Sequence, residues 1–228
     1  MLIIGHRGES GVEPENTIRS LKRSEEADAD MTELDIRRSK DGELVVFHDH
    51  SLKRLFGLRK SVASLTLDEL KEISKNREIP TLDEVLSTIG TDLVLDVKVY
   101  GIEKQLLVKI KNFPHKVLIT SWNPLVLKKI RALDRNIPLG PVFGIKGTLF
   151  LLPILIRFLR KLNIYSITII PQFVNPATMK RFRQIGWKVL PYSINDEKEF
   201  RRLEQLGVDG VFTDYPELIK QYEQSQSI

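Results

Sequence analysis

The sequence predicts an α/β fold of the (β/α)8 TIM-barrel class, and three observations lead to this prediction. Short runs of leucine and β-branched residues alternate with longer amphipathic stretches along the whole chain. Such alternation is typical of parallel strands that are covered by helices. The length of 228 residues suits one barrel, and no linker rich in Pro, Gly or Ser divides it. We therefore expect residues 1–228 to form a single domain.

Nine segments have the short apolar pattern of buried strands. A barrel of this class has eight strands, so one segment must be accessory, and the sequence does not indicate which. Residues 37–43 are too few for a crossover helix, and Asp41-Gly42 marks a turn there, so the second and third segments must be joined irregularly. The nine segments are Leu2–His6, Met31–Arg37, Leu44–His48, Leu93–Val99, Lys116–Ser121, Ile137–Phe143, Tyr165–Ile170, Lys188–Ile194 and Gly210–Thr213.

Helices are predicted between these strands from their amphipathic spacing. Pro14, Pro124, Pro176 and Pro216 suit the first turn of a helix, where a missing N–H is harmless. The predicted helices are Pro14–Ala27, Leu67–Lys75, Leu82–Ile89, Ile102–Asn112, Pro124–Leu133, Leu149–Leu162, Pro176–Ile185, Asp196–Leu206 and Pro216–Tyr222.

Composition excludes several classes of protein. The 35 basic and 30 acidic residues give a net charge of +5, which we interpret as a mild excess spread over the chain, so nucleic acid is not an expected partner. Without cysteine there is no thiolate chemistry, and any metal must have oxygen or nitrogen ligands. The first apolar run is too short for a signal peptide, and no run approaches the roughly 20 residues that span a bilayer. We expect a cytoplasmic protein.

Two histidines follow predicted strands at the end where barrels carry their reactive residues. His6 ends the first strand segment, and His48 ends the third. Histidine can act as an acid or a base near neutral pH, so we predict that His6 and His48 are the proton-transfer pair.

Three acidic side chains are predicted to point into the barrel. Side chains alternate in direction along a strand, so Glu33 and Asp35 share one face, and Asp96 shares a face with Lys98. A strand covered outside by helices must turn its apolar face outward and these acids inward. Three converging carboxylates form an oxygen-rich site suited to Mg²⁺ or Ca²⁺. The alternative is a network of structural salt bridges with Lys98 and Arg7.

Arg7 and Lys98 are candidate phosphate-binding residues, because Arg can bind an anion through two N–H groups and Lys supplies a point charge. A carboxylate–metal site with two cations and two histidines fits the hydrolysis of a phosphodiester. It does not fit redox chemistry. A metal, Arg7 and Lys98 would stabilise the charge that develops on the phosphate oxygens. The nucleophile could be water or a neighbouring hydroxyl of the substrate.

Ordered motifs over nearly the whole chain are similar to one known family. They are Gly5-His6-Arg7-Gly8, Pro14-Glu15-Asn16-Thr17, Glu33-Leu34-Asp35, Lys40-Asp41-Gly42, Val45-Val46-Phe47-His48-Asp49, Ile79-Pro80-Thr81-Leu82-Asp83-Glu84-Val85-Leu86, Asp96-Val97-Lys98, Ser193-Ile194-Asn195-Asp196 and Gly207-Val208-Asp209-Gly210-Val211-Phe212-Thr213-Asp214-Tyr215-Pro216. With these motifs the chain resembles the glycerophosphodiester phosphodiesterases.

This resemblance implies a barrel of the phospholipase-C-like phosphodiesterase type that cleaves glycerophosphodiesters to glycerol phosphate and an alcohol. It implies that His6 and His48 are the acid/base pair, with Arg7 and Lys98 binding phosphate. It further implies metal ligation by Glu33 and Asp35, with Mg²⁺ as the expected cation and Ca²⁺ or Mn²⁺ as alternatives.

Two further residues are assigned to the site, and the chain departs from the family pattern at three places. Glu15 is expected near the substrate, where it could orient His6 or the metal's water or complement a helix dipole. Tyr192 stands where the family usually has Trp, at the rim of the glycerol or alcohol pocket, and Asp96 stands where the family commonly has Glu as the third ligand. The insertion after the third strand is short and has Leu55-Phe56-Gly57 where the family has a polar run, so we expect a more open alcohol side.

Two alternative functions are open. One is a phospholipase of C or D type that acts on intact lipids, and the other is a catalytically silent barrel that binds phosphate esters. The apolar segment Leu149–Ile156 is expected to be a buried outer helix or an oligomer contact, or else a lid or shallow membrane contact beside the site.

Overall fold

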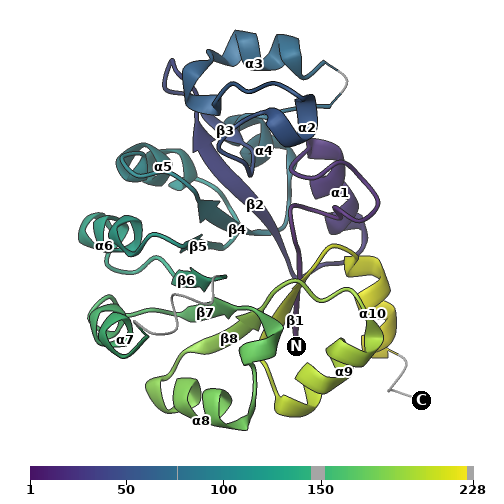
Figure 1. The fold of residues 1–228 in the computed structure, drawn as a ribbon, viewed down its shortest axis with the longest axis vertical. Helices are drawn as coiled ribbons and strands as arrows, with labels where there is room; N and C mark the ends of the chain where they lie inside the picture. Colours follow the sequence, from purple (N-terminus) through teal and green to yellow (C-terminus); the bar gives the residue numbers. More distant parts are fainter. Residues whose placement is uncertain (76, 145–151, 225–228) are drawn as a thin grey trace.

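The computed structural model describes residues 1–75, 77–144 and 152–224, and these form a barrel of eight parallel strands surrounded by helices (Figure 1). The hydrogen-bonded order is β8-β7-β6-β5-β4-β2-β1-β9. Two backbone hydrogen bonds bring the ends of this sheet together, from Asp209 to Val189 (3.1 Å) and from Ile194 to Phe212 (2.8 Å). The predicted fold class is confirmed.

Bounds of the strands are β1 (Leu2–Gly5), β2 (Met31–Arg38), β3 (Leu44–Val46), β4 (Asp92–Val97), β5 (Val117–Ser121), β6 (Leu139–Phe143), β7 (Ser166–Ile169), β8 (Lys188–Pro191) and β9 (Gly210–Thr213). The α-helices are α1 (Ile18–Glu26), α2 (Lys53–Phe56), α3 (Leu67–Ile73), α4 (Leu82–Thr88), α5 (Glu103–Ile110), α6 (Pro124–Leu133), α7 (Leu152–Arg160), α8 (Pro176–Ile185), α9 (Glu197–Leu206) and α10 (Pro216–Gln224). The 3₁₀-helices of the described residues are η1 (Val62–Ser64) and η3 (Pro171–Phe173). In this part of the chain no helix is long and apolar enough to cross a bilayer.

The accessory strand is β3, which pairs antiparallel with β2. β2 continues beyond the barrel, and β3 returns along this extension, with Ile36 opposite Val46 and Arg38 opposite Leu44. His48 thus reaches the barrel mouth because a hairpin brings the chain back. The expectation that it ends a barrel strand was wrong, although its position at the mouth agrees with that expectation.

A small lobe follows β3, as expected for a short insertion after the third strand. It contains α2, η1 and α3 and lies at the top of Figure 1. Its apolar side chains form a cluster separate from the main core. The buried members are Val45, Phe47, Leu52, Val62, Leu65, Leu70 and Ile79. This small core gives the lobe a fixed shape beside the barrel mouth.

Strand alternation places the acids inside the barrel, as predicted. Met31 and Val94 belong to the buried cluster inside the barrel, while Leu34 and Leu95 belong to the core between strands and helices. Side chains at every second position of a strand share one face. Glu33 and Asp35 therefore lie on the same face of β2 as Met31, and Asp96 lies on the same face of β4 as Val94. The barrel interior therefore changes from apolar at its base to acidic at its mouth.

The first helix starts later than predicted. α1 begins at Ile18 instead of Pro14, because Thr17 is its N-cap and accepts a hydrogen bond from the Ser20 backbone N–H. Residues 14–16 instead form a loop at the barrel mouth, with Asn16 at φ 60°. The sequence reading also missed α2, which lies in the small lobe.

Segment Leu149–Ile156 is only partly described. Residues 149–151 lie outside the described residues, and α7 begins at Leu152. Ile156 is buried in the main core, whereas Ile154 is exposed. The described part is thus an outer-ring helix that packs Ile156 against the core and turns Ile154 toward solvent.

Candidate active site

One cavity of about 730 Å³ opens at the mouth of the barrel. Of the nine residues predicted for the site, only Glu15 does not line it. The predicted residues that do are His6, Arg7, Glu33, Asp35, His48, Asp96, Lys98 and Tyr192. The remaining lining residues are Thr120, Trp122, Val142, Gly144, Thr168 and Phe212. The cavity therefore has a charged side, built from β1, β2, β4 and the segment after β3, and a largely apolar side built from later strands.

The three acids meet on the charged side. Glu33, Asp35 and Asp96 are buried, and they offer carboxylate oxygens that lie within 4.8 Å of one another. Burial together with repulsion from Asp35 and Asp96 raises the pKa of Glu33 to about 7. Burial would also raise the pKa of Asp35, but Lys98 and Arg7 outweigh it and lower that pKa. Asp35 is thus ionised at neutral pH, whereas Glu33 becomes fully charged only above about pH 7.

The donor set of this cluster fits a divalent cation. Asp96 Oδ1 is buried and has no hydrogen-bond partner within the described residues, which is costly unless another group satisfies it. Its other oxygen lies 2.5 Å from Lys98 Nζ, and the same ammonium lies 2.8 Å from Asp35 Oδ1. Converging carboxylate oxygens are the ligands that Mg²⁺ and Ca²⁺ prefer. Asp96, although shorter than Glu, still reaches the cluster.

The loop after β1 fixes the positions of the acids. Asn16 donates from Nδ2 to Asp35 Oδ2 (2.7 Å), and the Asp35 N–H donates to Asn16 Oδ1 (3.1 Å). The Arg7 N–H donates to Glu33 Oε2 at 2.8 Å. Gly8 has φ 80°, and a Cβ there would lie 2.4 Å from the Ser20 backbone. Only glycine therefore lets this loop pack against α1.

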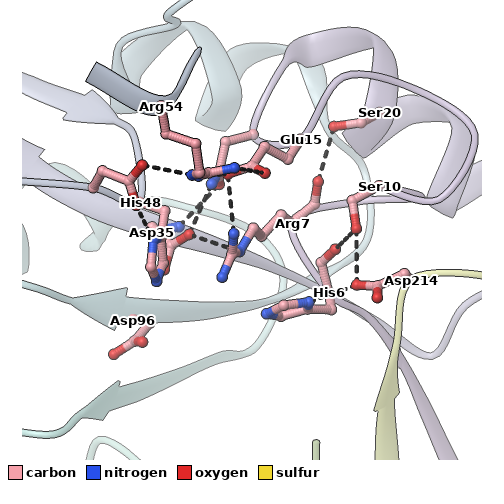
Figure 2. Close-up of polar contacts among 12 residues, drawn as sticks. His6, Arg7, Ser10, Glu15, Ser20, Asp35, His48, Arg54, Asp96 and Asp214 are labelled. Atoms are coloured by element: carbon pink, nitrogen blue, oxygen red, sulfur yellow. Dashed lines mark hydrogen bonds and ion pairs between the residues drawn. The ribbon is translucent and has the colours of Figure 1, made fainter. Parts of the chain in front are cut away.

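His6 is held by a carboxylate that follows the last strand. Its Nδ1 lies 2.7 Å from Asp214 Oδ1, and Asp214 also accepts from Ser10 Oγ (2.9 Å; Figure 2). Asn195 Nδ2 donates to the other oxygen of Asp214 at 2.6 Å. These bonds outweigh burial and lower the pKa of Asp214 to about 2, so the carboxylate is ionised and Nδ1 donates. Burial lowers the pKa of His6, but Asp214 and Glu33 outweigh it and raise it overall.

His48 has a similar arrangement with a different electrostatic result. Its Nδ1 lies 2.7 Å from Asp49 Oδ1, and Arg37 donates to its backbone carbonyl through Nε (2.8 Å) and Nη2 (2.7 Å). Burial lowers the pKa of His48, although Asp35 and Asp49 oppose this shift. In both histidines a carboxylate at Nδ1 leaves Nε2 available for proton transfer.

Arg54 of the lobe connects the two sides of this charged network. Its Nε lies 2.6 Å from Asp49 Oδ2, and its Nη1 and Nη2 donate to Glu15 at 2.8 and 2.6 Å. Glu15 in turn lies 3.0 Å from Arg7 Nη1 (Figure 2). The suggestion that Glu15 orients His6 is thus wrong, because Asp214 does so and Glu15 pairs with Arg7 and Arg54.

Sequence reasoning missed several residues of this site. Asp214 directly follows β9, so the strand-end rule that identified His6 could have found it. Trp122 directly follows β5 and could have been found in the same way. Asn16 and Arg54 lie in a loop and in the lobe, and no spacing in the sequence indicated their contacts.

The family of this chain follows from comparison with known proteins. The model of the glycerophosphoryl diester phosphodiesterase family matches residues 6–218. The chain belongs to this family. A glycerophosphodiester phosphodiesterase of Caldanaerobacter subterraneus is 30% identical over 239 residues, which cover 96% of each chain.

Two solved structures have the same fold as this chain. The glycerophosphodiester phosphodiesterase of Thermotoga maritima superposes with a TM-score of 0.87 at 28% identity, covering 97% of both chains. A phosphodiesterase of Oleispira antarctica, solved with the product sn-glycerol-3-phosphate, gives a TM-score of 0.85 at 28% identity and covers 98% of this chain and 97% of its own. As a member of the glycerophosphoryl diester phosphodiesterase family, the chain is a phosphodiesterase, and the alternative of a silent barrel is not supported.

Proposed function

We propose that this protein hydrolyses glycerophosphodiesters to glycerol phosphate and an alcohol, using a divalent cation and two histidines. The observation that carries the proposal is one cavity lined by three buried acids, two carboxylate-supported imidazoles and the cations of Arg7 and Lys98. The product found in the Oleispira antarctica phosphodiesterase supports glycerol phosphate as the product here.

Glu33, Asp35 and Asp96 would hold the cation, and Mg²⁺ is the expected one. When bound there, a divalent cation supplies positive charge that stabilises the developing charge on the phosphate oxygens. Arg7 and Lys98 line the same cavity and would bind the phosphate. Their present contacts to Asp35 keep both side chains at the cavity wall.

The two histidines are suited to opposite roles. The lowered pKa of His48 keeps its Nε2 unprotonated at neutral pH, so His48 would accept the proton of the nucleophile. Because its pKa is raised, the His6 imidazole retains a proton that it could donate to the leaving oxygen. The nucleophile is water or the glycerol hydroxyl next to the phosphate. Detection of a cyclic glycerol phosphate would indicate the hydroxyl.

Metal binding is expected to release a proton, with a dependence on pH that follows from Glu33. In the metal-free protein its pKa is about 7, so at pH 6 most Glu33 is protonated and must lose its proton to bind a cation. Below pH 7 the Mg²⁺ affinity should fall by up to about tenfold per pH unit. Calorimetry in two buffers of different ionisation enthalpy should find proton release near pH 6 and little above pH 8. Equal release at both pH values would contradict this role of Glu33.

Arg54→Ala is expected to lower kcat by about tenfold to a hundredfold, because charged hydrogen bonds to Asp49 and Glu15 are lost. Arg54→Lys should not restore the activity, since one ammonium cannot bridge both carboxylates. Added guanidinium ion should restore part of it. Lys53→Ala, on the same short helix, is the matched control and should behave as wild type. Wild-type kcat in Arg54→Ala would show that the bridge is dispensable.

A second candidate function is the cleavage of intact lipids, the phospholipase alternative from the sequence. It is favoured by the apolar wall of the cavity, where Trp122, Val142 and Phe212 could contact an acyl chain. Turnover of lysophosphatidylcholine at a rate comparable to that of glycerophosphocholine would support it. The cytoplasmic location, the single domain and a contact through Leu149–Ile156 stay predictions.

A further inference from the structure

Charged residues are divided unequally along this chain. Residues 104–195 contain sixteen Lys and Arg and a single acidic residue, Asp134, whereas the rest of the chain contains nineteen basic and twenty-nine acidic residues. The expectation that the basic excess is spread over the chain was therefore wrong. The net charge of +5 is the balance of one strongly basic segment and an acidic remainder.

The described part of the basic segment forms one side of the barrel. It runs from the first turn of α5 through α6 and α7 to β8, and Figure 1 shows α5, α6, α7 and α8 in this order along one side. The acidic remainder forms the other side, with the lobe, α1, α9 and α10. Sequence neighbours in the basic segment are thus also neighbours in space.

Most of these cations are free to meet a partner. Of the fifteen Lys and Arg in the segment that the structure describes, twelve are exposed. Within the described residues, only Lys109 and Lys116 of this set lie within 4 Å of a carboxylate oxygen. On the acidic side, by contrast, cations such as Arg23 and Lys71 are paired with Glu side chains. The basic side therefore carries uncompensated positive charge.

The same side exposes large apolar side chains. Ile154 of α7 is 75% exposed, Trp122 at the end of β5 is 63% exposed, and Val108 and Leu125 are also largely exposed. Trp122 both faces solvent and lines the cavity. Tyr100 is exposed after β4, the neighbour of β5, and so lies on the same part of the mouth.

We propose that this side of the barrel, from α5 to α8, docks on a membrane surface that contains anionic lipids. Lys and Arg attract anionic headgroups, and exposed Trp, Tyr and aliphatic side chains favour the interface between headgroups and acyl chains. Nucleic acid would match the charge but would leave Ile154, Val108 and Leu125 without an apolar partner. Because Trp122 also lines the cavity, docking would place the cavity mouth beside the headgroups.

Trp122 provides an intrinsic test of this proposal. The chain has two tryptophans, and Trp187 is buried, so Trp122 dominates any change of emission at the surface. Phosphatidylcholine vesicles that contain phosphatidylglycerol should shift the emission to the blue and should co-sediment with the protein, less so as salt rises. Vesicles of phosphatidylcholine alone should have much weaker effects. Equal binding to both kinds of vesicle, or to neither, would overturn the proposal.

Paired charge reversals locate the surface. Lys128→Glu with Lys129→Glu, both exposed on α6, should lower the partition onto anionic vesicles by at least about tenfold, since each basic residue near such a surface contributes about 1 kcal/mol. Lys22→Glu with Lys198→Glu reverses two exposed lysines on the acidic side and should have little effect. An equal loss of vesicle binding in both double variants would contradict the assignment of the docking surface to the side from α5 to α8.

Two further experiments distinguish membrane docking from purely electrostatic attraction and from binding of nucleic acid. Leu125→Ser should weaken vesicle binding while leaving its salt dependence unchanged, because it removes only apolar contact. Binding of a single-stranded RNA without vesicle binding would assign the surface to nucleic acid instead. Hydrolysis of soluble glycerophosphocholine should be unchanged in both lysine pairs, so loss of docking is distinguishable from failure of the proposed function.

Discussion

His48→Ala is expected to lower kcat by about 10²–10⁴-fold with a much smaller change in KM, because general acid/base catalysis contributes that much to the rate. His48 reaches the cavity on a hairpin, and Asp49 and Arg37 hold its ring and backbone in place. The imidazole is partly exposed, so its removal should leave the fold intact. Steady-state kinetics on glycerophosphocholine is the measurement.

Two comparisons identify the role of His48. Asp49→Asn should retain part of the activity, because it weakens the orientation of the imidazole without removing it. His50→Ala, two residues further in the same loop, is the matched control and should keep wild-type kcat, since His50 does not line the cavity. If His48→Ala retained more than about a tenth of wild-type kcat, His48 would not be the proton acceptor of the reaction.

Asp35→Asn is expected to lower kcat/KM by at least about a hundredfold and to weaken Mg²⁺ binding. Asp35 accepts from Lys98 at one oxygen and from Asn16 at the other, and the Arg7 Nε lies 3.3 Å away. An amide must turn its NH₂ group toward one of these donors, which leaves a buried cation or amide unpaired. The loss of one charge should also reduce the stabilisation that a cation provides, which is worth several kcal/mol.

Isothermal titration with Mg²⁺ alongside the kinetics separates these effects. Asp28→Asn, an exposed acid with positive φ that Asn tolerates, is the control and should match wild type in both assays. Thermal unfolding of Asp35→Asn should show whether the buried network also carries stability. Unchanged Mg²⁺ affinity in a folded Asp35→Asn variant would remove Asp35 from the set of ligands.

The inward acids were predictable from sequence because strand alternation is a local property. Glu33, Asp35 and Asp96 share the parity of buried interior residues, and the two strands are in register with Asp35 beside Asp96. The direction of β3 was not predictable in the same way. A short apolar run has the same sequence pattern whether it forms the next barrel strand or the returning strand of a hairpin. Only the short connection after Arg38 indicated that β2 and β3 are not joined by a helix.

Contacts between distant parts of the chain account for most of what sequence reading missed. Asp214 meets His6 across 208 positions, and Arg54 reaches Glu15 from the lobe across 39. Neither pairing has a spacing that a periodic pattern could reveal. The unequal distribution of charge could have been found in the sequence, but the total counts of basic and acidic residues do not show where along the chain they lie.

Release of glycerol phosphate from glycerophosphocholine, measured after chelation and again after Mg²⁺ is restored, tests the central claim most directly. The proposed function predicts activity that chelation abolishes and Mg²⁺ restores, with little recovery in Asp35→Asn. Full activity of the chelated protein would contradict a metal-dependent reaction at Glu33, Asp35 and Asp96. No turnover with any divalent cation would contradict the proposed substrate.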